Sequence, residues 1–163
     1  MGAEGRDFHN FLVYYRLRPN TEVVCFTAEQ IPGISKRTFP KELAGPQYSA
    51  DIPIYPEEQL ESRITRHKID EVALAYSDLP HQDVMMKASR VLAAGASFTL
   101  LGPHDTQLQS RKPVVSVCAV RTGAGKSQTS RKVAYLLKSW NYKVVAVRHP
   151  MPYGILKDQV VER

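Results

Sequence analysis

Residues 117–127 read VCAVRTGAGKS, and this stretch decides how we interpret the fold of the 163-residue chain. An apolar run leads into a glycine-rich turn, and a helical pattern over residues 127–140 begins directly after it. Strand, glycine turn and helix in this order are typical of a loop that binds phosphate groups. The stretch therefore predicts a nucleotide-binding strand–helix unit. The apolar face of its helix, which we expect to point inward, consists of Val133, Leu136, Leu137 and Trp140.

The residues of this turn have separate expected roles. Glycines let backbone N–H groups curl around phosphates, and the amino end of the following helix adds a partial positive charge. We expect Lys126 to reach the β and γ phosphates as a catalytic cation, Ser127 to hold Mg²⁺, and Arg121 to act as a second catalytic cation. The expected nucleotide-contacting residues are Arg121, Thr122, Gly123, Ala124, Gly125, Lys126, Ser127 and Gln128.

The turn departs from the common phosphate-loop pattern at Val120, which stands where a glycine is usual. In one branch of these nucleoside triphosphatases a second basic residue stands five positions before the lysine, and Arg121 occupies that place. A chance glycine turn is the alternative interpretation, but the flanking strand and helix favour nucleotide binding. The pattern does not distinguish ATP from GTP.

A second predicted strand, over residues 143–147, leads directly into Arg148 and His149. Ligands of open parallel sheets bind beyond the carboxyl ends of the strands, so these two side chains are expected beside the phosphate loop. There they could contact an anionic substrate or a transferred phosphoryl group. The alternative is that both are ordinary surface residues.

The preceding part of the chain alternates helices and strands in the manner of a parallel α/β sheet. We expect helices over 7–18, from Pro56 onward and from about residue 80 to Gly95, strands over 22–27, 71–76, 97–101 and 114–120, and a long loop or short extended excursion over 30–55. The predicted fold class is α/β, with a Rossmann-like parallel-sheet domain at 1–109 followed by the start of a P-loop NTPase domain at 110–163.

Both predicted domains look incomplete. The glycine turn at residues 2–5 leads into a helix, yet the strand that should precede such a turn is absent. The second block reaches only one strand and one loop beyond its own glycine turn. We therefore expect this chain to be a fragment of a longer protein. The turn at 2–5 either makes a tight strand-to-helix connection, which we favour, or binds a phosphate.

Positive charge is concentrated at one end of the chain. The formal net charge is +6, with 11 basic against 14 acidic residues over 1–109 and 11 against 2 over 110–163. The basic third suits a polyphosphate, whereas nucleic acid is the weakest option because no aromatic stacking pattern accompanies the cations. No apolar run has the roughly 20 residues that a membrane span needs, so a cytosolic protein is expected. Cys25 and Cys118 are expected to be inert, buried thiols.

The runs GRDFHNF (5–11), AYSD (75–78), RKPVVSVCAVRTGAGKSQTS (111–130) and RHPMPYG (148–154) resemble the cyclic 2,3-diphosphoglycerate synthetase family and its relatives among predicted GTPases. The resemblance covers essentially the whole chain, although members of that family are substantially longer. It implies an ATP-dependent enzyme, with Mg²⁺, that closes 2,3-diphosphoglycerate into its cyclic form. Arg121, Lys126 and Ser127 would then serve the nucleotide, and the segment of Arg148 and His149 would bind the diphosphoglycerate.

Two other functions share these motifs. One is a P-loop GTPase or ATPase that works as a switch or assembly factor and makes no small-molecule product. The other is a nucleotide-sensing regulatory module. The sequence leaves the oligomeric state open.

Overall fold

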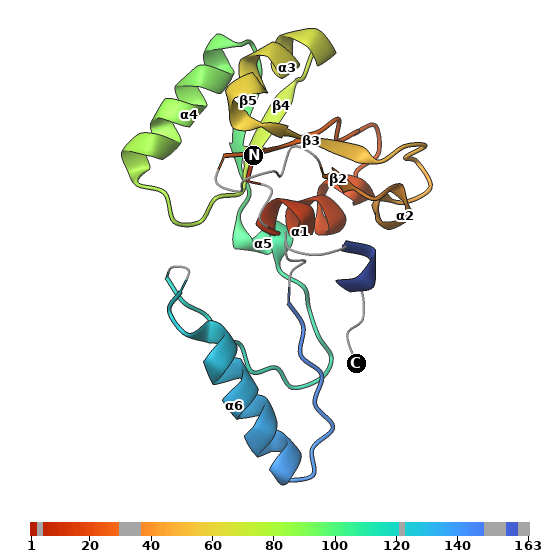
Figure 1. Ribbon diagram of the computed structural model, residues 1–163, viewed down its shortest axis with the longest axis vertical. Helices are drawn as coiled ribbons and strands as arrows, with labels where there is room; N and C mark the ends of the chain where they lie inside the picture. Colours follow the sequence, from red (N-terminus) through yellow and green to blue (C-terminus); the bar gives the residue numbers. More distant parts are fainter. Residues whose placement is uncertain (3–4, 30–36, 121–122, 149–155, 160–163) are drawn as a thin grey trace. The chain divides into compact units, whose positions relative to one another are not determined.

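The computed structural model describes residues 1–2, 5–29, 37–120, 123–148 and 156–159 of the chain (Figure 1). The chain divides into two compact units, one formed by Met1–Leu108 with His149–Arg163 and the other by Gln109–Arg148. The described part of the first unit is a mixture of α-helices and short strands, several of them parallel. The second unit contains one long helix.

The strands of the first unit form two small sheets. In one sheet, β3 (Ile52–Pro56) lies between β1 (Phe26–Ala28), to which it is parallel, and β2 (Thr38–Phe39), to which it is antiparallel. In the other, β4 (Glu71–Leu74) pairs in parallel with β5 (Ser97–Leu100). The segment at 30–55, expected to be a long loop or a short extended excursion, contributes β2 and most of β3 within its described residues.

Helical segments connect these strands. Those of the first unit are α1 (Arg6–Val13), η1 (Tyr15–Leu17), α2 (Lys41–Ala44), η3 (Glu57–Gln59), α3 (Leu60–His67), α4 (His81–Ala93), α5 (Pro103–Thr106) and η4 (Leu156–Gln159). The single helix predicted over 7–18 is interrupted at Tyr14, so that α1 is followed by a short 3-10 turn.

Aromatic side chains fill the first core, around α1 and the first sheet. Phe8 and Phe11 lie three residues apart on α1 and therefore share one face of the helix. Their rings meet those of Phe26 and Phe39, with centroid separations of 4.9 to 5.9 Å and mostly edge-on geometry. Edge-on pairs at this spacing are favourable because the positive edge of one ring faces the negative face of the next.

A second core lies between α3, α4 and the β4–β5 sheet. Leu60 and Ile64, one turn apart on α3, pack with Val72 and Val91. Leu92, the apolar neighbour of Val91 on α4, is 59% exposed.

The second unit differs from its prediction in two ways. Helix α6 (Lys126–Ser139) is present where predicted, yet none of its residues is buried, and Trp140 is 65% exposed. The predicted strands at 114–120 and 143–147 have no ladder partner among the described residues. An apolar run becomes a strand only when another strand accepts its backbone hydrogen bonds. The predicted P-loop domain at 110–163 and the Rossmann-like domain at 1–109 stay predictions.

The two thiols lie in different surroundings. Cys25 is half-buried, and burial raises the pKa of its thiol. Cys118 is exposed, so the prediction of a buried core thiol is wrong there, since the run around it pairs with no strand of the part of the chain that the structure describes. Within the described part of the chain, no helix is both long and apolar enough to cross a membrane.

Candidate functional site

The predicted phosphate loop lies at the amino end of α6. Gly123 and Gly125 have φ angles of +75° and +87°, in the left-handed region that glycine adopts without strain. A Cβ atom added at either glycine would meet none of the described residues within 4 Å. No side chain of the described residues caps the helix that starts at Lys126. The partial positive charge at the amino end of α6 is therefore not offset by a capping side chain from these residues.

The described residues of this loop are accessible to a ligand. Gly123, Ala124, Lys126, Ser127 and Gln128 are exposed, and Gly125 is half-buried. Arg121, Thr122 and His149 lie outside the described residues, and Arg148 is described and exposed. The predicted grouping of the loop with Arg148 and His149 thus stays a prediction.

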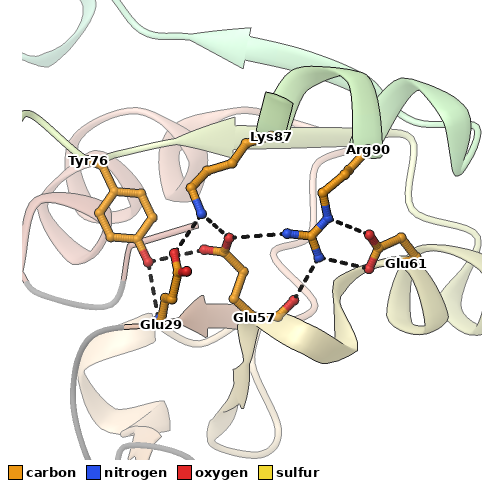
Figure 2. A network of polar contacts seen from close by, with 6 residues as sticks. All are labelled: Glu29, Glu57, Glu61, Tyr76, Lys87 and Arg90. Carbon is orange, nitrogen blue, oxygen red and sulfur yellow. Dashed lines mark hydrogen bonds and ion pairs between the residues drawn. The ribbon is translucent and has the colours of Figure 1, made fainter. Parts of the chain in front are cut away.

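A group of polar side chains lies at the carboxyl ends of strands in the first unit (Figure 2). Glu29 follows β1, Glu57 follows β3 and Tyr76 lies just beyond β4. Lys87 and Arg90 reach the same place from α4, and Figure 2 shows their side chains pointing toward the acidic residues. In open parallel α/β sheets, ligands usually bind beyond the carboxyl ends of the strands.

Hydrogen bonds connect nearly every polar atom of this group. Lys87 Nζ donates to Glu29 Oε2 at 2.6 Å and to Glu57 Oε1. Tyr76 Oη donates to Glu57 Oε2 at 3.1 Å and accepts the Glu29 N–H at 3.2 Å. Arg90 donates two hydrogen bonds to the carboxylate of Glu61, from Nε to Oε1 at 2.6 Å and from a terminal guanidinium nitrogen to Oε2 at 3.1 Å.

Opposite charges meet in this group, which we call the clamp and which consists of Glu29, Glu57, Glu61, Tyr76, Lys87 and Arg90. Glu57 is 2% exposed, and both of its carboxylate oxygens accept hydrogen bonds. Burial acts to lower the pKa of Lys87, but the hydrogen bonds and charges of Glu29 and Glu57 outweigh it and raise that pKa. Burial, assisted by the charge of Glu57, raises the pKa of Tyr76. Because these groups satisfy one another, their role in this structure is to hold α4 against the ends of the strands.

Sequence reasoning missed this network. In the sequence, Glu57 directly follows Pro56 at the start of a predicted helix, and nothing local to Glu57 or Lys87 indicates that the two side chains meet. A signal was present, because Lys87 lies three residues after Val84 and four before Val91, on the apolar face of α4. A charged residue at such a position needs a buried partner of opposite charge.

Asp7 is a further buried acid, at the amino end of α1. Its Oδ1 accepts the N–H of Phe8 at 2.9 Å and that of Gly5 at 3.3 Å. Its Oδ2 is buried and has no hydrogen-bond partner among the described residues. Burial raises the pKa of Asp7 to about 7. No group of three or more His, Cys, Asp or Glu side chains among the described residues could hold a metal ion.

Comparisons with known proteins bear on the function. No family model matches the chain, and no solved structure does. The chain is 61% identical, over 163 residues, to a protein of Thermococcus kodakarensis named arginine synthetase ArcE; the match takes in 100% of this chain and 36% of that relative. The chain thus spans about a third of the length of the curated relative that it matches.

This comparison corrects the expected function. A relative this similar is named for an amino-acid product, so the prediction of an enzyme that cyclises 2,3-diphosphoglycerate is wrong. The comparison gives no support to the alternatives, a P-loop GTPase or ATPase acting as a switch and a nucleotide-sensing module. The resemblance to the diphosphoglycerate synthetase family rested on the runs at 5–11, 75–78, 111–130 and 148–154, and shared motifs of this kind do not by themselves specify a product.

Proposed function

We propose that this chain is the ATP-binding portion of a synthetase that forms arginine. The observation that carries the proposal is the 61% identity to a protein named arginine synthetase along the whole chain. The glycine turn before α6 supports the nucleotide part of it. The proposal retains the expected fold, a Rossmann-like region followed by the start of a P-loop domain.

The turn fits a nucleotide's phosphates on physical grounds. Gly123 and Gly125 have positive φ angles and none of the described residues within 4 Å of an added Cβ, so a polyanion can approach the backbone closely. The uncapped amino end of α6, judged on the described residues, favours negative charge there. These two features act at the same place, which is what a phosphate site requires.

Each side chain of the turn has a proposed role. The Lys126 ammonium group attracts the β and γ phosphates, and the Ser127 hydroxyl is a ligand for Mg²⁺. Arg121 supplies a second positive charge, and Thr122, Ala124 and Gln128 line the same loop. ATP, when bound, supplies a phosphoryl or nucleotidyl group. Transfer of that group to an oxygen of the substrate turns this oxygen from a poor leaving group into a good one.

Arg148 is proposed to bind the second substrate. An arginine-forming enzyme handles an amino acid, whose α-carboxylate matches the planar fork of a guanidinium group. Arg148 follows the segment at 143–147, at the position expected to lie beside the loop. His149 is proposed to lie next to this carboxylate.

A chimera tests the proposal. The 163 residues of this chain would replace the matching segment of the Thermococcus kodakarensis relative. The measurement is the reverse of the proposed synthesis. It records whether ATP is formed, from ADP with phosphate or from AMP with pyrophosphate, only when arginine is supplied. We expect the chimera to be active and Lys126→Ala to lower the rate by about 100-fold or more, the scale seen when a group that stabilises transition-state charge is removed.

The matched control is Lys138→Ala, because Lys138 is an exposed lysine in the last turn of the same helix. This variant should keep the rate within about twofold, as distant surface substitutions usually do. Equal activity of the Lys126→Ala and Lys138→Ala chimeras would contradict the nucleotide site. ATP formation without any dependence on arginine would contradict the product.

A further inference from the structure

Asp7 and Asn10 lie three residues apart on α1, so their side chains leave the same face of this helix about one turn apart. Both residues are buried, with 5% and 4% of their surface exposed. Oxygen Oδ2 of Asp7 and oxygen Oδ1 of Asn10 each lack a hydrogen-bond partner among the residues that the structure describes. Buried oxygen atoms rarely stay without a donor, so two of them on one helix face need an explanation.

A single proton can satisfy both oxygens. An ionised carboxylate only accepts hydrogen bonds, whereas a protonated one also donates. The Asn10 amide offers both kinds of group, because its Oδ1 accepts and its Nδ2 donates. Side chains at this spacing on a helix are close enough to hydrogen-bond. A proton on Asp7 Oδ2 would therefore be donated to Asn10 Oδ1, and both oxygens would have a partner.

The surroundings of Asp7 favour binding of this proton near neutral pH. Burial raises the pKa of Asp7 to about 7, although the Met1 amino group and the N–H groups of Gly5 and Phe8 act to lower it. A charged carboxylate loses its hydration in such a place, and a neutral acid loses less.

Other charged groups near α1 have partners of their own. Arg6 and His9, on α1 itself, contact Thr106 of α5. Glu71 accepts a hydrogen bond from Tyr15 of η1, directly after α1. Two further pairs lie on neighbouring elements, namely His104 beside Asp105 on α5 and Lys87 with Glu57 in the clamp. Burial therefore has the largest effect on the proton of Asp7.

We propose that Asp7 and Asn10 form a proton-operated switch at the amino end of α1. With the proton bound, Asp7 Oδ2–H donates to Asn10 Oδ1. When the proton leaves to solvent, the Asn10 amide turns about its Cβ–Cγ bond, and Nδ2–H donates to the Asp7 carboxylate. One hydrogen bond joins the two side chains in both states, and its direction reverses. This inference is independent of the proposed function.

The switch also reaches the backbone at the start of α1. Asp7 Oδ1 accepts the N–H groups of Gly5 and Phe8. An ionised carboxylate is a stronger acceptor than a neutral acid, so these two bonds strengthen as the proton leaves. The first turn of α1 thereby responds to pH near neutrality.

Nuclear magnetic resonance of the labelled chain between about pH 5 and pH 9 tests the switch. We expect the Asp7 Cγ carbon and the Asn10 side-chain amide to titrate with one common midpoint near pH 7. Above the midpoint, a scalar coupling through the hydrogen bond should connect Asn10 Nδ2 with Asp7 Cγ, and below it this coupling should vanish. The side-chain amides of Asn20 and Asn141, both exposed, are internal controls that should show no step there.

Asp7→Asn separates the switch from a general response to pH. A carboxamide at position 7 cannot ionise, and its N–H donates to Asn10 Oδ1 at every pH. The Asn10 amide should therefore lose its step in this variant, whereas Asp83→Asn, at an exposed acid of α4, should keep it. A step that persists in Asp7→Asn would overturn the proposal. Absence of the coupling above the midpoint in the unaltered chain would do the same.

Discussion

Asp7 is held at the amino end of α1 by two backbone N–H groups, in a place where only 5% of the residue is exposed. Burial raises its pKa from 3.8 to about 7. The folded state therefore binds this proton more tightly than the unfolded state does. The resulting stabilisation is complete below about pH 4 and is lost as pH rises through 7.

We accordingly expect the free energy of unfolding to fall between pH 4 and pH 7 by an amount on the order of 4 kcal/mol, if the whole shift of about three pKa units is realised. Asp7→Asn removes the titrating group, so this variant should lose that dependence. Urea unfolding at several pH values measures it. The control is Asp83→Asn, an exposed acid of α4, which should leave the profile unchanged. A wild-type profile in the Asp7→Asn protein would refute the assignment.

Lys87 provides a second test at this scale. Replacing it with methionine leaves the buried Glu57 carboxylate without its main cationic partner. Breaking one side of a buried ion pair costs about 3 to 5 kcal/mol, so Lys87→Met should lower the free energy of unfolding by that much. Adding Glu57→Gln should recover part of the loss, because no uncompensated charge remains.

Urea denaturation of both single variants and the double variant measures the coupling. Glu58→Gln is the matched control, since Glu58 is the exposed neighbour of Glu57. If the changes in the free energy of unfolding caused by the Lys87 and Glu57 substitutions simply add in the double variant, the two side chains are not coupled.

At the scale of elements, α4 ends at a glycine that its geometry requires. Gly95 has a φ of +96°, its N–H donates to the carbonyl of Leu92, and the next N–H, of Ala96, donates to Val91. This is a helix ending that favours glycine. Gly95→Ala should cost about 1 kcal/mol through backbone strain alone, because nothing lies within 4 Å of the added Cβ.

Gly102→Ala is the comparison within the same unit. Gly102 has a φ of −75°, which alanine adopts freely, and a Cβ there meets only an ordinary contact. The free energy of unfolding, from thermal or urea melts, should be unchanged or slightly higher in this variant. Equal losses in the two variants would mean that backbone conformation does not determine the effect.

At the scale of the whole molecule, the two units differ in how much apolar surface they bury. Trp140 is the single tryptophan and is 65% exposed in the second unit. Its fluorescence should therefore resemble that of a hydrated indole, with strong quenching by acrylamide. It should change little across the urea transition that circular dichroism records for the first unit. A blue-shifted, protected emission would indicate that Trp140 packs against a partner.

Several elements could be predicted from the sequence because their causes are local. The spacing of apolar residues predicts α3, α4 and α6 with bounds that lie within a few residues of those in the structure. The two glycines before Lys126 predict the turn at which α6 begins. Phe8 and Phe11 lie three residues apart, and this spacing places both on one face of a helix. Backbone propensity, helix spacing and glycine's freedom at positive φ act over a few residues, so a single sequence contains them.

The features that only the tertiary structure decided depend on contacts between residues that are distant along the chain. The burial of Glu57 depends on Lys87, 30 residues away, and the place of Met1 depends on Ala73, 72 residues away. The runs at 114–120 and 143–147 have strand-like sequences but no ladder partner among the described residues, and Leu92 lies on an apolar stripe yet faces solvent. Burial and strand pairing are properties of two surfaces that meet, and a local pattern specifies only one of them.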